Sequence, residues 1–250
     1  MNCIHSWVIH GLFLINFKEP MVIPSLPHNT HINSLQTHRQ ETAVERISLL
    51  VDYETGYGGA VYPVYNPYVF FRNGTVVKEP KIAIEDMDLQ ARSSDAGRWG
   101  SWKRTGSKVL ITWDKPGRNG KIQTSEKDWP GHEAYPASDN EKLNGSWGSV
   151  GGGGNLALGG SIGILAAKNF HFTSDGHFTT GSLAAISAPG QVGRSRKTDS
   201  GTYNLSGHTL TLRFDNGETR KLFFCFMSKD KTKSIRIGGS NYTPNKSPKH

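Results

Sequence analysis

A short pattern that occurs twice, about 100 residues apart, constrains the fold of this chain more than any other feature. Residues 68–76 and residues 170–178 both place aromatic side chains at alternate positions and then an Asn-Gly or Asp-Gly pair. Such alternation is the strongest short-range signal for a β-hairpin, because Asn, Asp and Gly tolerate the positive φ of the tight turn. Each copy therefore predicts a hairpin, with its turn at Gly74 or at Gly176.

A second pair of segments repeats in the same order, at residues 100–114 and 201–215. Each segment begins with glycine, carries an aromatic residue two positions later (Trp102 or Tyr203), and continues through a second glycine into apolar residues at every second position. Period-two alternation predicts a strand with one face in a core and the other in water. The copies are offset by 102 residues in the hairpin pattern and by 101 in this one, so we interpret them as one internal repeat.

The repeat and the composition together predict an all-β protein. Hydrophobic residues make up only 35% of the chain, whereas it has 29 glycines and 12 prolines, which favours short strands and many turns over long helices. We predict an antiparallel meander barrel, or a pair of barrels, built from two repeats of about 100 residues and preceded by a flexible N-terminal tail. The predicted boundaries are 1–45 for the tail or a degraded targeting segment, 46–137 for the first repeat, 138–245 for the second, and 246–250 for a C-terminal tail.

The second copy also carries a recognisable order of short motifs. It opens with a Gly-x-Trp at Gly145 and Trp147, and three further motifs follow: Asp175-Gly176, Gly201-Thr202-Tyr203 and Asp215-Asn216-Gly217. In this order the motifs resemble lipocalin-like (calycin-type) β-barrel domains, including the uncharacterised bacterial ones, over residues 143–242; the first copy echoes them more weakly over residues 47–123. The resemblance implies an antiparallel barrel or half-barrel that often holds an apolar ligand, and it implies no catalytic residue. The doubled unit and the long loop at residues 151–167 depart from a single lipocalin cup.

The function that these features favour is a non-enzymatic binding protein that holds a small, largely apolar ligand in or over a β-barrel. Small barrels fill their interior with side chains or enclose one small ligand. We expect four aromatic residues to face the ligand: Tyr62, Tyr65, Trp102 and Tyr203. The glycine-rich loop at residues 151–167 would act as a flap; it lacks the Lys-Ser/Thr pair and the following helix of a nucleotide site.

Two other functions remain open at this stage. Residues 53–68 hold five of the eight tyrosines, and rigid aromatic rings on an exposed segment suit a structural or protein-interaction module, although such rings also pack edge strands. The third reading is a barrel enzyme, an isomerase or hydrolase, whose polar residues converge only in three dimensions.

The charge of the chain is concentrated near its C-terminus. The net charge is +8, and residues 190–250 account for all of it, with twelve Lys and Arg against four acidic residues. Six of these basic residues lie in two predicted loops: Arg194, Arg196 and Lys197, and Lys229, Lys231 and Lys233. If the loops meet, we expect a rim that attracts an anionic partner such as a nucleic-acid backbone or anionic lipid; solvated turns are the alternative.

The sequence contains no recognisable constellation for catalysis, a metal or a cofactor, and we predict none of these. His171 and His177 flank one hairpin turn, but two ligands without a third do not make a zinc site. Cys225 lies in an apolar run and is predicted to be a buried free thiol. No transmembrane span is predicted, because the apolar residues 7–17 are too few. They are no clear signal peptide either, although the cell envelope or secretion is the expected location.

Overall fold

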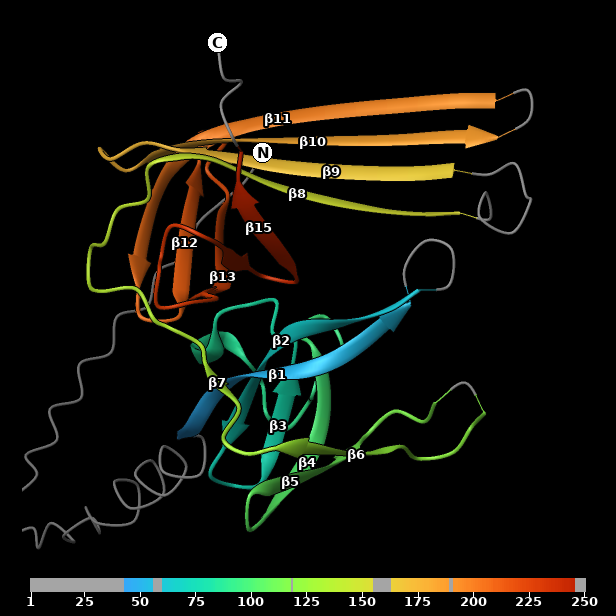
Figure 1. The fold of residues 1–250 in the computed structure, drawn as a ribbon. Helices are drawn as coiled ribbons and strands as arrows, with labels where there is room; N and C mark the ends of the chain where they lie inside the picture. The colour runs from blue at the N-terminus through green and yellow to red at the C-terminus, as the bar shows by residue number, and fades with distance from the viewer. Residues whose placement is uncertain (1–42, 56–59, 118, 155–162, 189–190, 246–250) are drawn as a thin grey trace, which may run out of the picture. The chain divides into compact units, whose positions relative to one another are not determined.

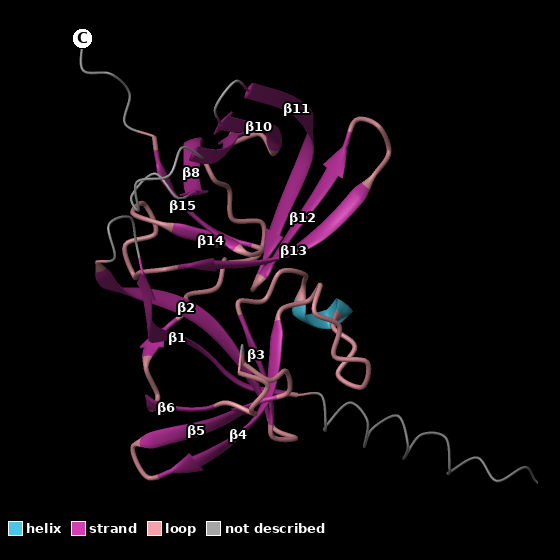
Figure 2. Cartoon of the chain, turned by 90° about the vertical axis from the view of Figure 1, so that its right-hand side faces the viewer, coloured by secondary structure: helices cyan, strands magenta, loops and turns pink. Residues whose placement is uncertain are grey.

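The computed structural model describes residues 43–55, 60–117, 119–154, 163–188 and 191–245 (Figure 1). The two predicted tails lie almost entirely outside these ranges, as does the middle of the predicted flap. Within them the protein is all-β, with one short 3₁₀ turn at Ile84–Asp86, and the paired strands run antiparallel (Figure 2). The fold class predicted from the sequence is confirmed.

The first group of strands forms a seven-stranded, half-barrel sheet in the order β6-β5-β4-β3-β2-β1-β7. Its strands are β1 (Val44–Thr55), β2 (Val61–Phe71), β3 (Thr75–Lys78), β4 (Arg98–Thr105), β5 (Lys108–Trp113), β6 (Thr124–Asp128) and β7 (His132–Glu133). From β1 to β6, strands that follow one another in the sequence also lie next to one another in the sheet, so these six strands form a meander.

The second group closes into an eight-stranded barrel in the order β10-β11-β12-β13-β14-β15-β8-β9. Its strands are β8 (Gly145–Gly154), β9 (Gly163–Phe172), β10 (His177–Ala188), β11 (Gln191–Ser206), β12 (Thr209–Phe214), β13 (Thr219–Phe226), β14 (Ile235–Ile237) and β15 (Ser240–Pro244). The closure is short: β15 pairs with β8 only where Thr243 lies opposite Gly148 and Pro244 opposite Trp147.

The two predicted hairpins adopt the same geometry. The amide of Gly74 donates to the carbonyl of Phe71 at 3.0 Å, and the amide of Gly176 donates to the carbonyl of Thr173 at 3.0 Å. Both glycines have the positive φ that the sequence required, +81° and +92°.

The second pair of repeated segments, residues 100–114 and 201–215, also makes matching backbone hydrogen bonds in the two copies. The amides of Trp102 and Tyr203 donate to the carbonyls of the two turn glycines, each at 2.8 Å. At the far end of each segment, the amide of Asp114 donates to Trp99 at 3.1 Å, and that of Asp215 donates to Ser200 at 3.0 Å. The same hydrogen bonds therefore recur 101 or 102 residues apart in the half-barrel and in the barrel.

Side chains fill the interior of the barrel. Its buried cluster is rich in aromatic rings, and its larger members are Trp147, Phe170, Phe172, Phe178, Tyr203, Phe214, Phe224, Phe226 and Tyr242. The half-barrel has its own cluster around Leu50, Tyr68 and Phe70. Because alternate residues of a strand point to opposite faces, β13 sends Phe224 and Phe226 inward and Phe223 and Cys225 outward.

The outward side chains of β13 are buried as well. Phe223 and Cys225 share a third cluster with Leu49 and Val69 of the half-barrel sheet, so both faces of β13 are covered. Cys225 is a free, buried thiol, as predicted. Burial raises its pKa to about 12, which keeps it in the protonated, unreactive form.

Candidate ligand-binding site

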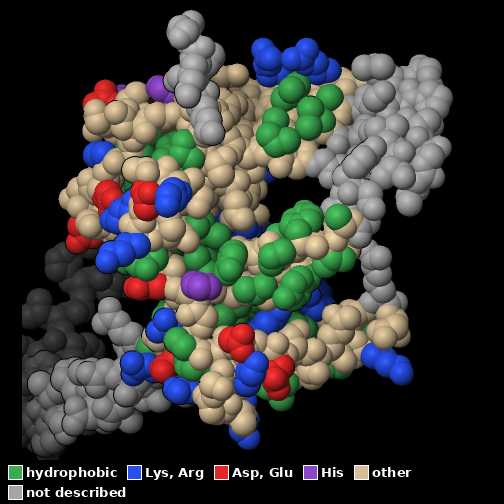
Figure 3. All heavy atoms as spheres, viewed as in Figure 1, with side chains coloured by type: hydrophobic (Ala, Val, Ile, Leu, Met, Phe, Trp, Pro, Cys, Tyr) green, Lys and Arg blue, Asp and Glu red, His purple; other side chains and the backbone are tan. Residues whose placement is uncertain are grey.

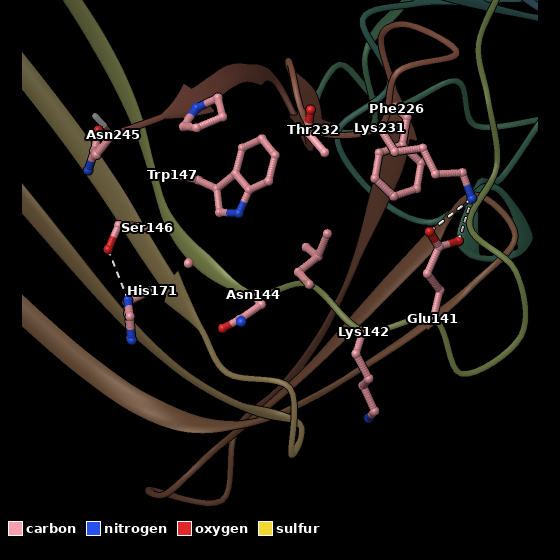
Figure 4. Close-up of a pocket in the computed structure, with 13 residues that line it drawn as sticks. Glu141, Lys142, Asn144, Ser146, Trp147, His171, Phe226, Lys231, Thr232 and Asn245 are labelled. Carbon is pink, nitrogen blue, oxygen red and sulfur yellow. Dashed lines mark hydrogen bonds and ion pairs between the residues drawn. The ribbon is translucent and has the colours of Figure 1, made fainter. Parts of the chain in front are cut away.

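A cavity of about 840 Å³ lies at one end of the barrel (Figure 4). Its wall combines three segments that are distant in the sequence: residues 141–147 leading into β8, the loop after β13 with Lys231 and Thr232, and the end of β15. Its floor is the end of the barrel core, where Leu143, Trp147 and Phe226 are buried. An apolar floor with a polar rim is the usual composition of a small-molecule site.

Trp147, which lines this cavity, carries a polar group that is unpaired among the described residues. Its side chain is only 5% exposed, and in the described part of the chain its indole nitrogen is the buried side-chain donor that has no hydrogen-bond acceptor. Three other tryptophans of the described residues each donate their indole N–H at 2.6 to 2.9 Å: Trp99 to Ser93, Trp102 to Phe71 and Trp113 to Ser125. A buried donor without an acceptor costs about 1–3 kcal/mol, so this position calls for an explanation.

Tyr203 fixes the segment that carries Trp147. Its hydroxyl accepts a hydrogen bond from the amide of Leu143 at 2.9 Å, and it lies 2.9 Å from the carbonyl of the same residue, to which it can donate. Burial raises the pKa of this phenol, so it stays protonated and able to donate. The entry into β8, and with it the cavity floor, is thereby tied to β11.

An ion pair holds the polar rim. Lys231 lies 2.6 Å from the carboxylate of Glu141, and its ammonium group lies 4.8 Å above the ring of Phe226. Glu141 also accepts a hydrogen bond from the amide of Ser138 at 2.7 Å. Burial raises the pKa of Glu141, but these partners outweigh it and lower the pKa overall, so the pair is charged at neutral pH. Lys231 thus joins the loop after β13 to the segment before β8.

Ser146 and His171 form a hydrogen-bonded pair in the lining of the cavity. Ser146 Oγ lies 2.9 Å from His171 Nδ1, and the two residues are direct cross-strand neighbours in β8 and β9. Because the adjacent Trp147 points into the barrel core, Ser146 points to the outer side of the barrel wall. Ser146, His171 and Trp147 nevertheless all line the cavity, so its lining includes residues from both faces of β8.

The four aromatic residues that we expected at the ligand do not come together. Tyr62 and Tyr65, on β2, are 45% and 43% exposed. Trp102 stacks on Trp129 at the half-barrel core, with ring centroids 5.5 Å apart, and Tyr203 is buried in the barrel core. Cross-strand partners share a face, so Tyr65 lies on the same face as Tyr53 and Val61, whereas Tyr62 lies on the opposite face of β2. Figure 3 shows hydrophobic side chains over the ends of β1 and β2.

The structure also contains a buried polar cluster that the sequence did not reveal. The carboxylate of Asp52, on β1, lies 2.9 Å from Lys78 and 2.8 Å from Lys127. It also accepts hydrogen bonds from Asn66 at 2.9 Å and Tyr68 at 3.0 Å. Burial raises the pKa of this carboxyl, but hydrogen bonds from the lysines and Asn66 outweigh it and bring the pKa to about 2. Since β1 and β6 are not paired, the contact from Lys127 joins the two sides of the half-barrel.

The basic residues of the two predicted loops have different surroundings. Lys231 pairs with Glu141, and Lys233 lies 3.5 Å from Asp230. Arg194 and Arg196 lie on the long strand β11 instead of in a loop, and they are exposed. Among the described residues, no group of three or more His, Cys, Asp or Glu could hold a metal ion. No helix within those same residues has the length and apolar character to cross a membrane.

Comparison with protein-family models, with curated proteins and with solved structures gave no match. The class of this protein is therefore defined by its own fold, an all-β chain with a closed eight-stranded antiparallel barrel and a half-barrel sheet. A barrel of this kind is compatible with the lipocalin-like resemblance of its motifs.

Proposed function

We propose that this protein is a non-enzymatic binding protein that holds a small, largely apolar ligand over the end of its β-barrel, in the cavity floored by Trp147. The observation that carries the proposal is the indole N–H of Trp147, which is buried and has no acceptor in the described structure. Because this nitrogen is buried, a ligand would have to displace the ring slightly to supply an acceptor, and the new hydrogen bond would remove the cost of the unpaired donor.

The lining of the cavity defines the chemistry of the ligand. Leu143, Trp147 and Phe226 offer an apolar floor, and the rim offers hydrogen-bond donors from Lys142, Asn144 and Thr232, in addition to the Lys231–Glu141 pair. A ligand with an apolar or aromatic body and at least one carbonyl or hydroxyl acceptor fits this arrangement. Binding over the barrel is favoured over binding inside it, because core side chains occupy the interior.

The lipocalin-like assignment is part of this proposal. It is supported by the order of the motifs, by barrel closure, and by the Gly-x-Trp at the start of β8, whose tryptophan forms the cavity floor. The doubled architecture would then combine one closed barrel with one half-barrel derived from the same meander.

A dye titration tests the proposal. Nile red is apolar, carries a carbonyl acceptor and fluoresces when it leaves water, so we expect saturable binding to the full chain. Thr232→Trp, at an exposed rim position, fills the cavity and should weaken binding at least about 10-fold, the effect of roughly 1.4 kcal/mol. The matched control is Tyr62→Ser with Tyr65→Ser, which removes two exposed aromatic rings from β2 and should leave the affinity unchanged.

The same titration addresses the second candidate function, a protein-interaction module. The observation in its favour is the exposure of Tyr53 and Val61, 72% and 65%, on the same face of β1 and β2 as the exposed Tyr65. If the tyrosine variant abolishes dye binding and Thr232→Trp does not, the cavity is not the site, and the exposed surface of β1 and β2 becomes the better candidate.

A further inference from the structure

Four strands of the barrel continue well beyond its closed part. β8 pairs with β9 out to Gly154 opposite Gly163, and β10 pairs with β11 out to Ala188 opposite Gln191. In contrast, β12 pairs with β11 only from Gly201 onward. We call this extension, residues 149–154, 163–169, 180–188 and 191–198, the ribbon; Figure 1 shows its four strands projecting side by side past β12 and β15.

The outer face of the ribbon is apolar. Cross-strand partners share a face, which places Val150, Ala167 and Leu183 in one row that ends at Arg196. The next row places Leu165 and Ala185 beside Arg194. Val150 is three residues beyond the inward-pointing Trp147, so its row faces away from the barrel interior.

Two of these apolar side chains are open to solvent, as Val150 is 75% exposed and Leu165 is 43% exposed, whereas Leu183 is half-buried. Figure 3 shows hydrophobic side chains on the ribbon beside the Lys and Arg of β11. The residues around them are small, mainly Gly, Ala and Ser, so the sheet presents a flat surface.

The charge of this part of the chain has one sign. Residues 149–169 and 179–198 contain four cations, Lys168, Arg194, Arg196 and Lys197, and no Asp or Glu. Lys197 lies 3.2 Å from Asp199, at the base of the ribbon, whereas within the described residues neither arginine has a carboxylate in ion-pair distance. Cations on an exposed edge strand also discourage edge-to-edge pairing, but that role does not account for the uncovered Val150 and Leu165, which lie on β8 and β9.

We propose that the outer face of the ribbon binds the surface of an anionic lipid bilayer. Val150, Leu165 and Leu183 would enter the boundary between headgroups and acyl chains, while Arg194 and Arg196 reach lipid phosphates. The partner must offer an apolar region for the aliphatic side chains and anionic groups for the two arginines. A bilayer of anionic lipids offers both. A single-stranded nucleic acid is the poorer partner, because residues 149–169 and 179–198 contain no aromatic side chain on which bases could stack.

Vesicle flotation with the full chain tests the proposal. We expect the protein to float with phosphatidylcholine vesicles that contain 30 mol% phosphatidylglycerol, to bind pure phosphatidylcholine far less, and to lose binding as salt rises. Arg194→Ala with Arg196→Ala should weaken binding roughly 20- to 30-fold, given the typical contribution of a basic residue near an anionic surface. The charge-matched control, Lys229→Ala with Lys233→Ala, should change it less than about 3-fold.

A second pair of variants tests the apolar contribution. Val150→Ser with Leu165→Ser should weaken flotation about 10-fold or more, whereas Leu110→Ser with Ile122→Ser, at positions 44% and 58% exposed, should have no effect. All these positions are exposed, so thermal unfolding followed by circular dichroism should show folded proteins. Absence of flotation with anionic vesicles at low salt would overturn the proposal. So would equal losses in the ribbon and control variants, or binding of single-stranded RNA that depends on the two arginines while flotation does not.

Discussion

At the scale of single residues, the indole nitrogen of Trp147 is the group from which the proposed function follows, and Trp113 offers a matched comparison. Both side chains are buried, but the Trp113 N–H donates to Ser125 at 2.9 Å, whereas that of Trp147 has no acceptor in the described structure. Replacing either residue by Phe removes the same ring volume. We therefore expect Trp113→Phe to reduce the free energy of unfolding by about 1–2 kcal/mol more than Trp147→Phe does.

Urea unfolding of the ligand-free protein, followed by circular dichroism, measures this difference. Nile red affinity should fall for Trp147→Phe and stay constant for Trp113→Phe. Equal stability losses in the two variants would mean that the Trp147 N–H is already satisfied in the free protein, and the main support for the cavity as a binding site would be removed.

Asp52 gives the half-barrel a defined pH dependence. Its pKa is about 2 in the folded state and about 3.9 in an unfolded chain, so the folded state binds this proton more weakly. The resulting contribution of about 2 kcal/mol is complete above pH 4 and is lost as the pH falls from about 4 towards 2. When the free energy of unfolding is measured against pH, Asp52→Asn should lack this loss of stability between about pH 4 and 2.

The control for this measurement is Asp128→Asn, which removes an exposed carboxylate whose partner is the exposed Lys108. Lys108 lowers the pKa of Asp128 as well, but both groups are exposed to solvent, so the loss of stability at acid pH should change far less than in Asp52→Asn. If the two variants give the same curve between pH 4 and 2, the Asp52 carboxylate does not sit in the charged network described above.

At the scale of the strand pair, Gly201 and Gly100 lie where two neighbouring strands come close together, β11 with β12 and β4 with β5. A Cβ on Gly201 would lie 2.0 Å from the carbonyl oxygen of Arg213, and one on Gly100 would lie 2.6 Å from that of Thr112, the equivalent contact in the half-barrel. We expect Gly201→Ala and Gly100→Ala each to destabilise the protein by at least about 2 kcal/mol.

Gly193→Ala, also on β11, has nothing within 4 Å of its new methyl group and should change stability by less than about 0.5 kcal/mol. Thermal and urea unfolding of the three variants provide the measurement. If Gly201→Ala leaves the stability unchanged, β11 and β12 do not lie as close together at this position as the structure indicates.

The hairpins could be predicted from the sequence because their determinants are local. Asn-Gly, Asp-Gly and alternating apolar residues specify the turns at Gly74 and Gly176, and the structure confirms them. Burial of the outer face of β13 could not be predicted in this way, because Phe223 and Cys225 pack against residues far earlier in the chain, such as Leu49 and Val69. The partners of Asp52 likewise come from three other strands, and no local pattern reports them.

At the scale of the whole molecule, the all-β antiparallel architecture could be predicted from the sequence, and the structure confirms it. That Tyr62, Tyr65, Trp102 and Tyr203 face a ligand stays a prediction; one pair lies on an exposed strand, and the other two lie in separate cores. The cavity combines residues 141–147, 231–232 and 244–245, which only barrel closure brings together. Trp147 was visible as part of a motif, yet its missing acceptor becomes apparent only once its neighbours are placed.

The central claim is that the barrel-end cavity holds a small, largely apolar molecule, and native mass spectrometry of the full chain purified from its source tests it most directly. The account predicts a mass above that of the polypeptide, an excess that disappears after organic extraction and is absent from Trp147→Phe and Thr232→Trp. A mass equal to that of the polypeptide, together with no saturable Nile red binding by the parent protein, would contradict the claim.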